Sequence, residues 1–93
     1  MNKRKLLQKA LASPNNLRFV ELTALVEAMG FRLSRTNGSH HIFKHPEVRE
    51  QVNLQDVKGK AKPYQVRQVV ELIEAYNLTF IYTRAEEAEE DNL

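Results

Sequence analysis

The alternation of apolar and polar residues divides the chain into helical and strand-like segments. Apolar residues recur every three to four positions over residues 3–12 and again over 17–29, and this spacing predicts two amphipathic helices. The apolar stripe of the second helix consists of Phe19, Leu22, Leu25, Val26 and Met29. Asn15 or Asn16 is the expected N-cap of this helix. Gly30 is the expected residue just beyond its C-terminus.

Three short segments after the second helix alternate between apolar and polar positions, as strands with one buried face do. They span residues 31–36, 40–45 and about 50–55. The dipeptide Asn37-Gly38 between the first two is a strong signal for a two-residue hairpin loop. A last amphipathic helix is predicted over residues 63–76, and residues 78–82 resemble a further strand. Phe31, Leu33, Val52 and Leu54 define the expected buried face of the sheet.

This order of elements predicts an α+β fold. The three strands form an antiparallel sheet, and the two longer helices cover one face while the other stays open to solvent. The helix-strand-strand-strand-helix core spans about residues 17–78, and the 3–12 helix is an N-terminal addition. The 93 residues are enough for one small domain. We expect this domain over residues 1–84, followed by a disordered acidic tail over 85–93.

Charge is distributed unevenly along the chain. The net charge is +2, but residues 85–93 contain four glutamates and one aspartate and carry −5, so residues 1–84 carry about +7 by subtraction. A basic body is typical of proteins that bind polyanions. The acidic tail either folds back over the basic surface or only aids solubility, and the sequence leaves both readings open.

Composition excludes several classes of protein. The chain has no cysteine, so disulfides and thiolate zinc sites are excluded. No apolar run approaches the roughly 20 residues of a membrane span. The basic start, Lys3-Arg4-Lys5, precedes only two leucines and is a poor secretory signal. We therefore expect a cytoplasmic protein that does not contact membranes and needs no cofactor.

All three histidines lie in the predicted 40–45 strand. Successive strand residues point to opposite faces, and Phe43 is the largest apolar residue here, so it defines the buried face. His41 shares that face, whereas His40 and Lys44 project from the open face. Imidazole gains and loses a proton near neutral pH. His40 is therefore our candidate for acid–base chemistry, and an ordinary surface histidine is the alternative.

The open face carries other polar groups. Alternation places Gln51, Asn53 and Gln55 of the third strand on the same side as His40. The turn residue Ser39 either orients an imidazole or closes the turn. A metal site built from the three histidines is disfavoured, because alternation separates His40 from the other two, and we expect no metal.

The segment Gly38-Ser39-His40-His41-Ile42-Phe43, after a helix that ends in Gly30-Phe31, resembles the HicA family of toxin–antitoxin mRNA interferases. The later segments Val52–Gln55 and Gly59–Gln68 resemble one branch of it. The resemblance implies a fold like a double-stranded-RNA-binding domain. It also implies a toxin that cleaves mRNA, takes part in a stress response and is neutralised by a HicB-like antitoxin.

The resemblance assigns the catalytic role to His40, which agrees with the face that alternation gives it. The other candidate residues would contact the substrate, and they are Gly38, Ser39, Arg35, Lys44, Lys60 and Lys62. The expected partners are an mRNA substrate and the antitoxin, with no DNA contact by this chain alone. Many family members have a proline and a further histidine on the third strand, where this chain has Asn53-Leu54-Gln55.

Two other functions are compatible with these residues. A non-catalytic RNA-binding module would recognise A-form RNA with lysines in a loop and at a helix start, and the Lys58–Lys62 segment before Pro63 suits that role. A plain protein-interaction domain is the remaining possibility. Loss of cleavage with retained binding in His40→Ala separates the enzyme from the binding module.

Overall fold

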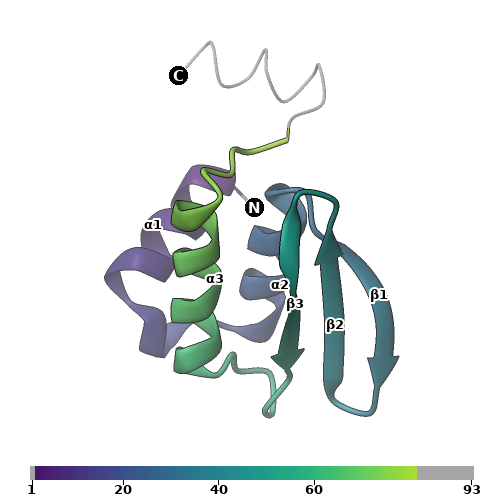
Figure 1. Ribbon diagram of the computed structural model, residues 1–93. Coiled ribbons are helices and arrows are strands. Elements are labelled where there is room, and N and C mark those ends of the chain that lie inside the picture. Colours follow the sequence, from purple (N-terminus) through teal and green to yellow (C-terminus); the bar gives the residue numbers. More distant parts are fainter. Residues whose placement is uncertain (1, 82–93) are drawn as a thin grey trace.

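The computed structural model describes residues 2–81, in which helices cover one face of a three-stranded antiparallel sheet (Figure 1). The elements in chain order are α1 (Lys3–Ala12), the 3₁₀ helix η1 (Pro14–Asn16), α2 (Phe19–Ala28), β1 (Arg32–Asn37), β2 (His40–His45), β3 (Val48–Gln55) and α3 (Pro63–Ala75). The strands lie in the order β1-β2-β3. The predicted α+β architecture is therefore confirmed.

The core lies between the sheet and helices α2 and α3, with α1 packed across both helices. The inner face of the sheet contributes Phe43, Val52 and Leu54, which are at most 2% exposed. Leu22, Leu25, Val66 and Val69 meet them from the helices. Burying each such side chain contributes about 1.5–3 kcal/mol. No helix of residues 2–81 lies on the opposite face of the sheet (Figure 1).

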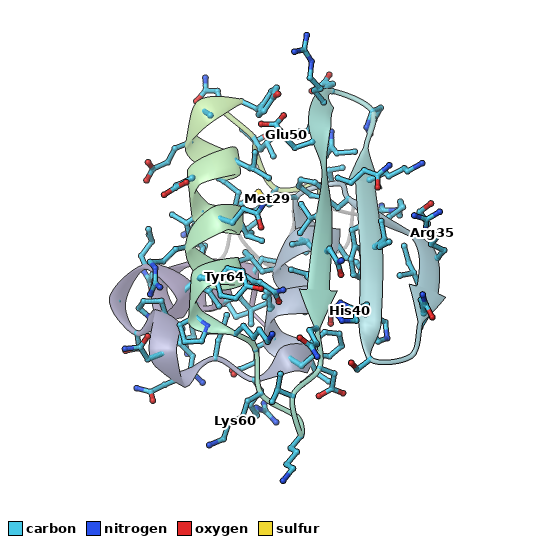
Figure 2. All side chains as sticks on the ribbon, turned by 60° about the horizontal axis from the view of Figure 1, so that its bottom comes forward. Met29, Arg35, His40, Glu50, Lys60 and Tyr64 are labelled. Atoms are coloured by element: carbon cyan, nitrogen blue, oxygen red, sulfur yellow. The ribbon has the colours of Figure 1, made fainter. Side chains whose placement is uncertain are left out.

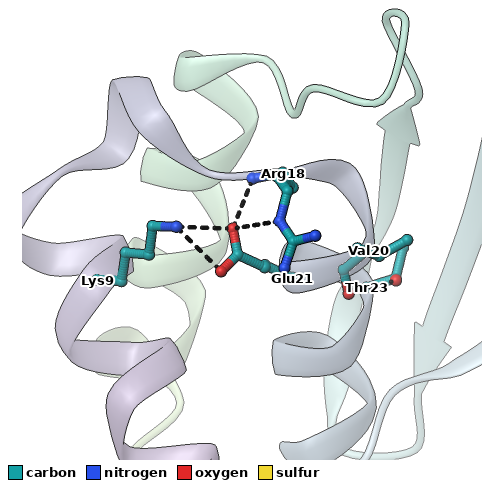
Figure 3. A network of polar contacts seen from close by, with 5 residues as sticks. All are labelled: Lys9, Arg18, Val20, Glu21 and Thr23. Atoms are coloured by element: carbon teal, nitrogen blue, oxygen red, sulfur yellow. Dashed lines mark hydrogen bonds and ion pairs between the residues drawn. The ribbon is translucent and has the colours of Figure 1, made fainter. Parts of the chain in front are cut away.

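The start of α2 differs from the prediction that an asparagine caps it. Asn15 and Asn16 belong to η1, and the N-cap of α2 is Arg18. The backbone N–H of Arg18 donates to Oε1 of Glu21 at 2.9 Å, so a side chain inside the first turn replaces the expected cap. Nζ of Lys9 donates to both carboxylate oxygens of Glu21 at 2.9 and 3.0 Å, which joins α1 to α2 (Figure 3).

The buried carboxylate of Glu21 remains charged because its partners outweigh its burial. Burial opposes ionisation, but the hydrogen bond from the Arg18 N–H and the bonds and charge of Lys9 outweigh it, so the pKa of Glu21 lies below its usual value. A lowered pKa means that this stabilisation is present above the unfolded value of about 4.3 and is lost as the pH falls below it. The junction of α1 and α2 therefore weakens in acid.

Strand β1 is one of the two edge strands, and only β2 pairs with it among the described elements. The prediction that Leu33 is buried is wrong, because its side chain is 51% exposed and the helices lie over β3 rather than β1. The register is irregular between Leu33 and Arg35. Regular alternation would place these two residues on one face. The irregularity instead pairs Arg35 with Ile42, on the open face.

Residues 78–81 are not a strand, contrary to the prediction. Asn77 has a φ of 54° and ends the α3 turn. The N–H of Ile81 then donates to the carbonyl of Ala28 at 2.8 Å, so this segment runs beside the end of α2 and does not pair with a strand. Tyr82 and the predicted acidic tail lie outside the described residues. Among residues 2–81, no helix has the length and apolar character that crossing a membrane requires.

Candidate active site

A two-residue turn joins β1 to β2 and precedes His40. Asn37 pairs with His40, so the loop consists of Gly38 and Ser39 and not of Asn37 and Gly38 as predicted. Gly38 has a φ of 62°, in the left-handed region that favours glycine. Apart from Gly38 itself and its two chain neighbours, no heavy atom of residues 2–81 lies within 4 Å of the position that a Cβ of Gly38 would occupy. The outer surface of this turn is therefore open to a ligand.

His40 lies on the open face of β2, opposite Gln55 of β3 (Figure 2). Its Nδ1 lies 3.1 Å from Oδ1 of Asn53, which also projects from β3. An amide oxygen can only accept a hydrogen bond, so in this arrangement Nδ1 carries the proton. In the neutral ring the Nε2 atom then keeps its lone pair, and no side chain of residues 2–81 bonds to it. The ring is partly exposed.

His41 and Ser39 have structural contacts. The ring of His41 lies against Phe19 with 4.8 Å between ring centroids, and its Nδ1 lies 3.2 Å from the carbonyl oxygen of Ser39. The hydroxyl of Ser39 accepts a hydrogen bond from Nε2 of Gln55 at 3.3 Å. Ser39 therefore closes the turn, and its hydroxyl does not orient the imidazole of His40.

The lysine-rich segment after β3 is a tight hairpin. Val57 and Lys60 exchange two backbone hydrogen bonds of 3.0 Å, and Lys58 and Gly59 between them have φ values of 52° and 84°. Oδ1 of Asp56 accepts the N–H of Gly59 at 2.7 Å. The Gly59 carbonyl in turn accepts the N–H of Phe19 at 2.9 Å. The exposed lysines of this hairpin are thus held by a fixed backbone.

The hairpin, the start of α3 and the turn before His40 meet at one end of the molecule (Figure 2). The N–H of Asp56 donates to the carbonyl of Ser39 at 3.0 Å. The N–H of Gln55 donates to Oε1 of the buried Gln65 on α3 at 2.9 Å. The tertiary structure therefore brings the Lys58–Lys62 segment to the end of the sheet that carries His40.

Tyr64 is a candidate contact that the sequence reasoning missed. It lies in the first turn of α3, its side chain is 57% exposed, and Nζ of Lys62 lies 5.8 Å from the centroid of its ring. An exposed aromatic ring beside lysines is suited to stacking with a nucleobase. The sequence did contain a signal for Tyr64, because this residue lies outside the apolar stripe of α3 and closely follows a lysine-rich loop.

Arg35 and Lys44 extend the basic open face along the sheet. Arg35 pairs with Ile42, one position beyond His40 on that face, and Lys44 pairs with Arg32. Lys44 lies four residues from His40, or about 13 Å along the strand. Lys44 is therefore suited to a neighbouring phosphate and not to the one that His40 would contact.

His45 lies at the far end of β2 and is not part of this site. It shares the inner face with Phe43 by the alternation of strand residues, and it pairs with Val48 beyond the register shift between β2 and β3. Within residues 2–81, no group of three His, Cys, Asp or Glu side chains is placed to hold a metal ion. The functional groups that the structure brings together are an imidazole, amides and cations.

These features define a small α+β protein with a partly exposed histidine on the open, basic face of its sheet. The model of the family described as HicA toxin of bacterial toxin-antitoxin matches residues 20–75, which is more than half of the chain. The chain therefore belongs to the HicA toxin family, as its resemblance indicated, and membership implies an antitoxin partner. Helix α1 lies outside the matched region. Neither the curated proteins nor the solved structures gave a match.

Proposed function

We propose that this toxin is an endoribonuclease that cleaves mRNA with His40 as its catalytic residue. The observation that supports the proposal is the placement of Nε2 of His40. This atom lies on the open face and has no bonding partner among residues 2–81, while Asn53 contacts the other ring nitrogen. The cationic hairpin at the same end of the sheet supplies the charge that an RNA substrate needs.

RNA carries its own nucleophile, the 2′-hydroxyl group. In the proposed reaction, Nε2 of His40 removes the proton of this hydroxyl while its oxygen attacks the adjacent phosphorus. The bond from phosphorus to the 5′-oxygen breaks, and that oxygen takes a proton from the imidazolium or from water. A positioned imidazole contributes about 10²–10⁴-fold to such a rate. The reaction uses only groups that this chain, RNA and water supply.

The surrounding cations stabilise negative charge on the phosphates. The Lys58–Lys62 segment lies at the His40 end of the sheet, and Arg35 lies on the open face opposite Ile42, one position beyond His40. Fixed cations near a reacting phosphate stabilise the transition state because they need no reorganisation. The open turn at Gly38 and Ser39 leaves room for the RNA backbone, and Tyr64 offers a stacking surface to a neighbouring base.

The same basic open face also offers a way for an antitoxin to neutralise the toxin. A HicB-like antitoxin with an acidic surface would cover the open face and exclude RNA from His40. The cations of the face are then shared by the two partners, so RNA and antitoxin should compete. This arrangement requires no change of conformation in the toxin.

The test compares the purified parent with His40→Ala and Gln51→Ala on a defined mRNA. Gln51 is the matched control, because it is an exposed residue of the same face without a bond to His40. We expect His40→Ala to bind RNA like the parent and to lose cleavage by at least about 100-fold, and its expression to relieve growth arrest. Equal cleavage by His40→Ala would refute the catalytic assignment. Binding without cleavage by the parent would favour the RNA-binding module.

A further inference from the structure

We infer that Asn53 is a positioning residue whose amide holds the imidazole of His40 in the tautomer that keeps the lone pair on Nε2. The inference rests on the proposed catalytic role of His40 and deepens it. Nothing in the family match assigns a role to this asparagine. It matters because only a neutral ring with an unprotonated Nε2 can act as a base toward the 2′-hydroxyl.

The geometry of the sheet produces the contact. Asn53 pairs with Ile42 of β2, and His40 pairs with Gln55, so Asn53 and His40 are diagonal neighbours on one face. Diagonal positions lie about 7–8 Å apart between Cα atoms, within reach of polar side chains. The observed distance from Nδ1 of His40 to Oδ1 of Asn53 is 3.1 Å.

The backbone around Asn53 is firmly held. Its neighbours Val52 and Leu54 are 0% exposed and point into the core. The β2–β3 register is regular from His40 to Phe43, opposite Gln55 to Val52. A residue fixed in this way can hold a partner in one orientation, as a preorganised site requires.

The chemistry of the amide distinguishes it from a carboxylate. The Nδ1–H group of His40 donates to the amide oxygen of Asn53, and the amide adds no charge. When the ring is neutral, this bond therefore places its single proton on Nδ1 and leaves Nε2 free to accept a proton. An aspartate in the same place would favour the imidazolium ion, because an opposite charge within about 4–6 Å stabilises the charged form.

Among the described residues, no other side chain shares this role. The hydroxyl of Ser39 bonds to Gln55. His41 uses the backbone carbonyl of Ser39 for its own Nδ1, so no side-chain substitution can alter its partner. The tautomer of His40, by contrast, depends on one replaceable side chain.

The first experiment observes the tautomer directly and needs no RNA. Nitrogen-15 spectra of the imidazole rings in the full chain report which ring nitrogen of His40 carries the proton. We expect the Nδ1–H form in the parent and a shift toward the Nε2–H form in Asn53→Leu. A parent in the Nε2–H form, or an unchanged tautomer in Asn53→Leu, would overturn the inference.

The second measurement tests the contact by adding a negative charge at position 53. In Asn53→Asp the midpoint of the His40 titration should move up by about one pH unit or more. Gln51→Asp is the matched control, because it adds the same charge to the same face of β3 two residues away. A shift in Asn53→Asp no larger than that in Gln51→Asp would mean that position 53 does not contact the ring.

Cleavage of RNA then separates this inference from the proposed function. Asn53→Leu should lower kcat by at least about tenfold, because the wrong tautomer removes the base. In Asn53→Asp the acid limb of the pH profile should move with the titration midpoint. If the spectra agree with the inference but the parent cleaves no RNA, the proposed function fails while the positioning of His40 by Asn53 stands.

Discussion

His40 and His45 lie at the two ends of β2 and are used differently. His40 has one ring nitrogen 3.1 Å from a side-chain amide and the other without a partner among residues 2–81. The ring of His45 bonds through both nitrogens. Its Nε2 lies 3.0 Å from the carbonyl oxygen of Met29, and its Nδ1 accepts the N–H of Glu47 at 3.0 Å. The rings of His45 and Phe31 also pack edge to face, with their centroids 5.0 Å apart.

The difference shows how hydrogen bonding decides what a histidine can do. A backbone N–H points at Nδ1 of His45, so its proton must sit on Nε2, where it is donated to a carbonyl. Both nitrogens are then committed to the fold, and the ring has no free site for proton transfer. His40 retains such a site. His45 is therefore a structural residue, and His40 is a candidate catalytic one.

The test with the largest expected effect removes each of the two rings in turn and compares stability with RNA cleavage. His45→Ala should lower the free energy of unfolding by about 2–4 kcal/mol, because it leaves the buried Met29 carbonyl without a donor and opens a cavity beside Phe31. His40→Ala should cost less than about 0.5 kcal/mol, as a surface substitution does. Chemical denaturation measures both, and RNA cleavage per folded molecule should survive only in His45→Ala. Equal losses of stability would contradict the comparison.

The glycines near the two ends of β2 extend the comparison between these ends. Gly30 has a φ of 101°, and a Cβ there would lie 2.8 Å from Cδ1 of Ile81 and 2.9 Å from Nε2 of His45. Gly38 has a φ of 62° and open space around it. We expect Gly38→Ala to cost about 1 kcal/mol of backbone strain and Gly30→Ala to cost at least about twice that. The melting temperatures of the two variants measure this difference. A lower melting temperature for Gly38→Ala than for Gly30→Ala would contradict it.

His41 lies between the two extremes and should behave as a structural residue. Its ring packs on Phe19, so His41→Ala should destabilise the protein by about 1 kcal/mol. Residual cleavage should follow the folded fraction, which circular dichroism measures in the same samples. A fully folded but inactive His41→Ala protein would move the catalytic assignment from His40 to His41.

The smallest expected effect concerns the cations at the His40 end. Removing Lys60 and Lys62 together should reduce the slope of log affinity for single-stranded RNA against log salt by roughly 1–1.5 units, at about 0.7 per phosphate. The control removes Lys5 and Arg49, two exposed cations outside this site. Filter binding over a range of salt concentrations measures the slopes. If the two double variants have the same slope, the RNA lies elsewhere.

Local sequence was sufficient for the three longer helices, for the three strands of the sheet and for the faces of β2. The 3–12 helix and the 40–45 strand have the predicted bounds, because helical and strand periodicities are properties of neighbouring residues. Alternation also placed His40 and His41 on opposite faces of the sheet, because successive residues of a regular strand point to opposite faces. The family match over residues 20–75 agrees with the resemblance that the Gly38–Phe43 segment carries.

Pairings between distant segments required the tertiary structure. The register irregularity in β1 moves Arg35 to the open face, and the outer position of β1 exposes Leu33. Residues 78–81 have strand-like composition but run beside α2, and no local pattern identifies that neighbour.

The site itself shows the same division. The sequence determined that an imidazole and an amide row share one face, because strand alternation is local. Only the β2–β3 register decided that Asn53 meets His40. Only contacts between separate segments, among them the bond from Asp56 to Ser39, place the lysine hairpin at the same end. Such contacts depend on where separate segments pack in space, and side-chain spacing along one segment does not encode that.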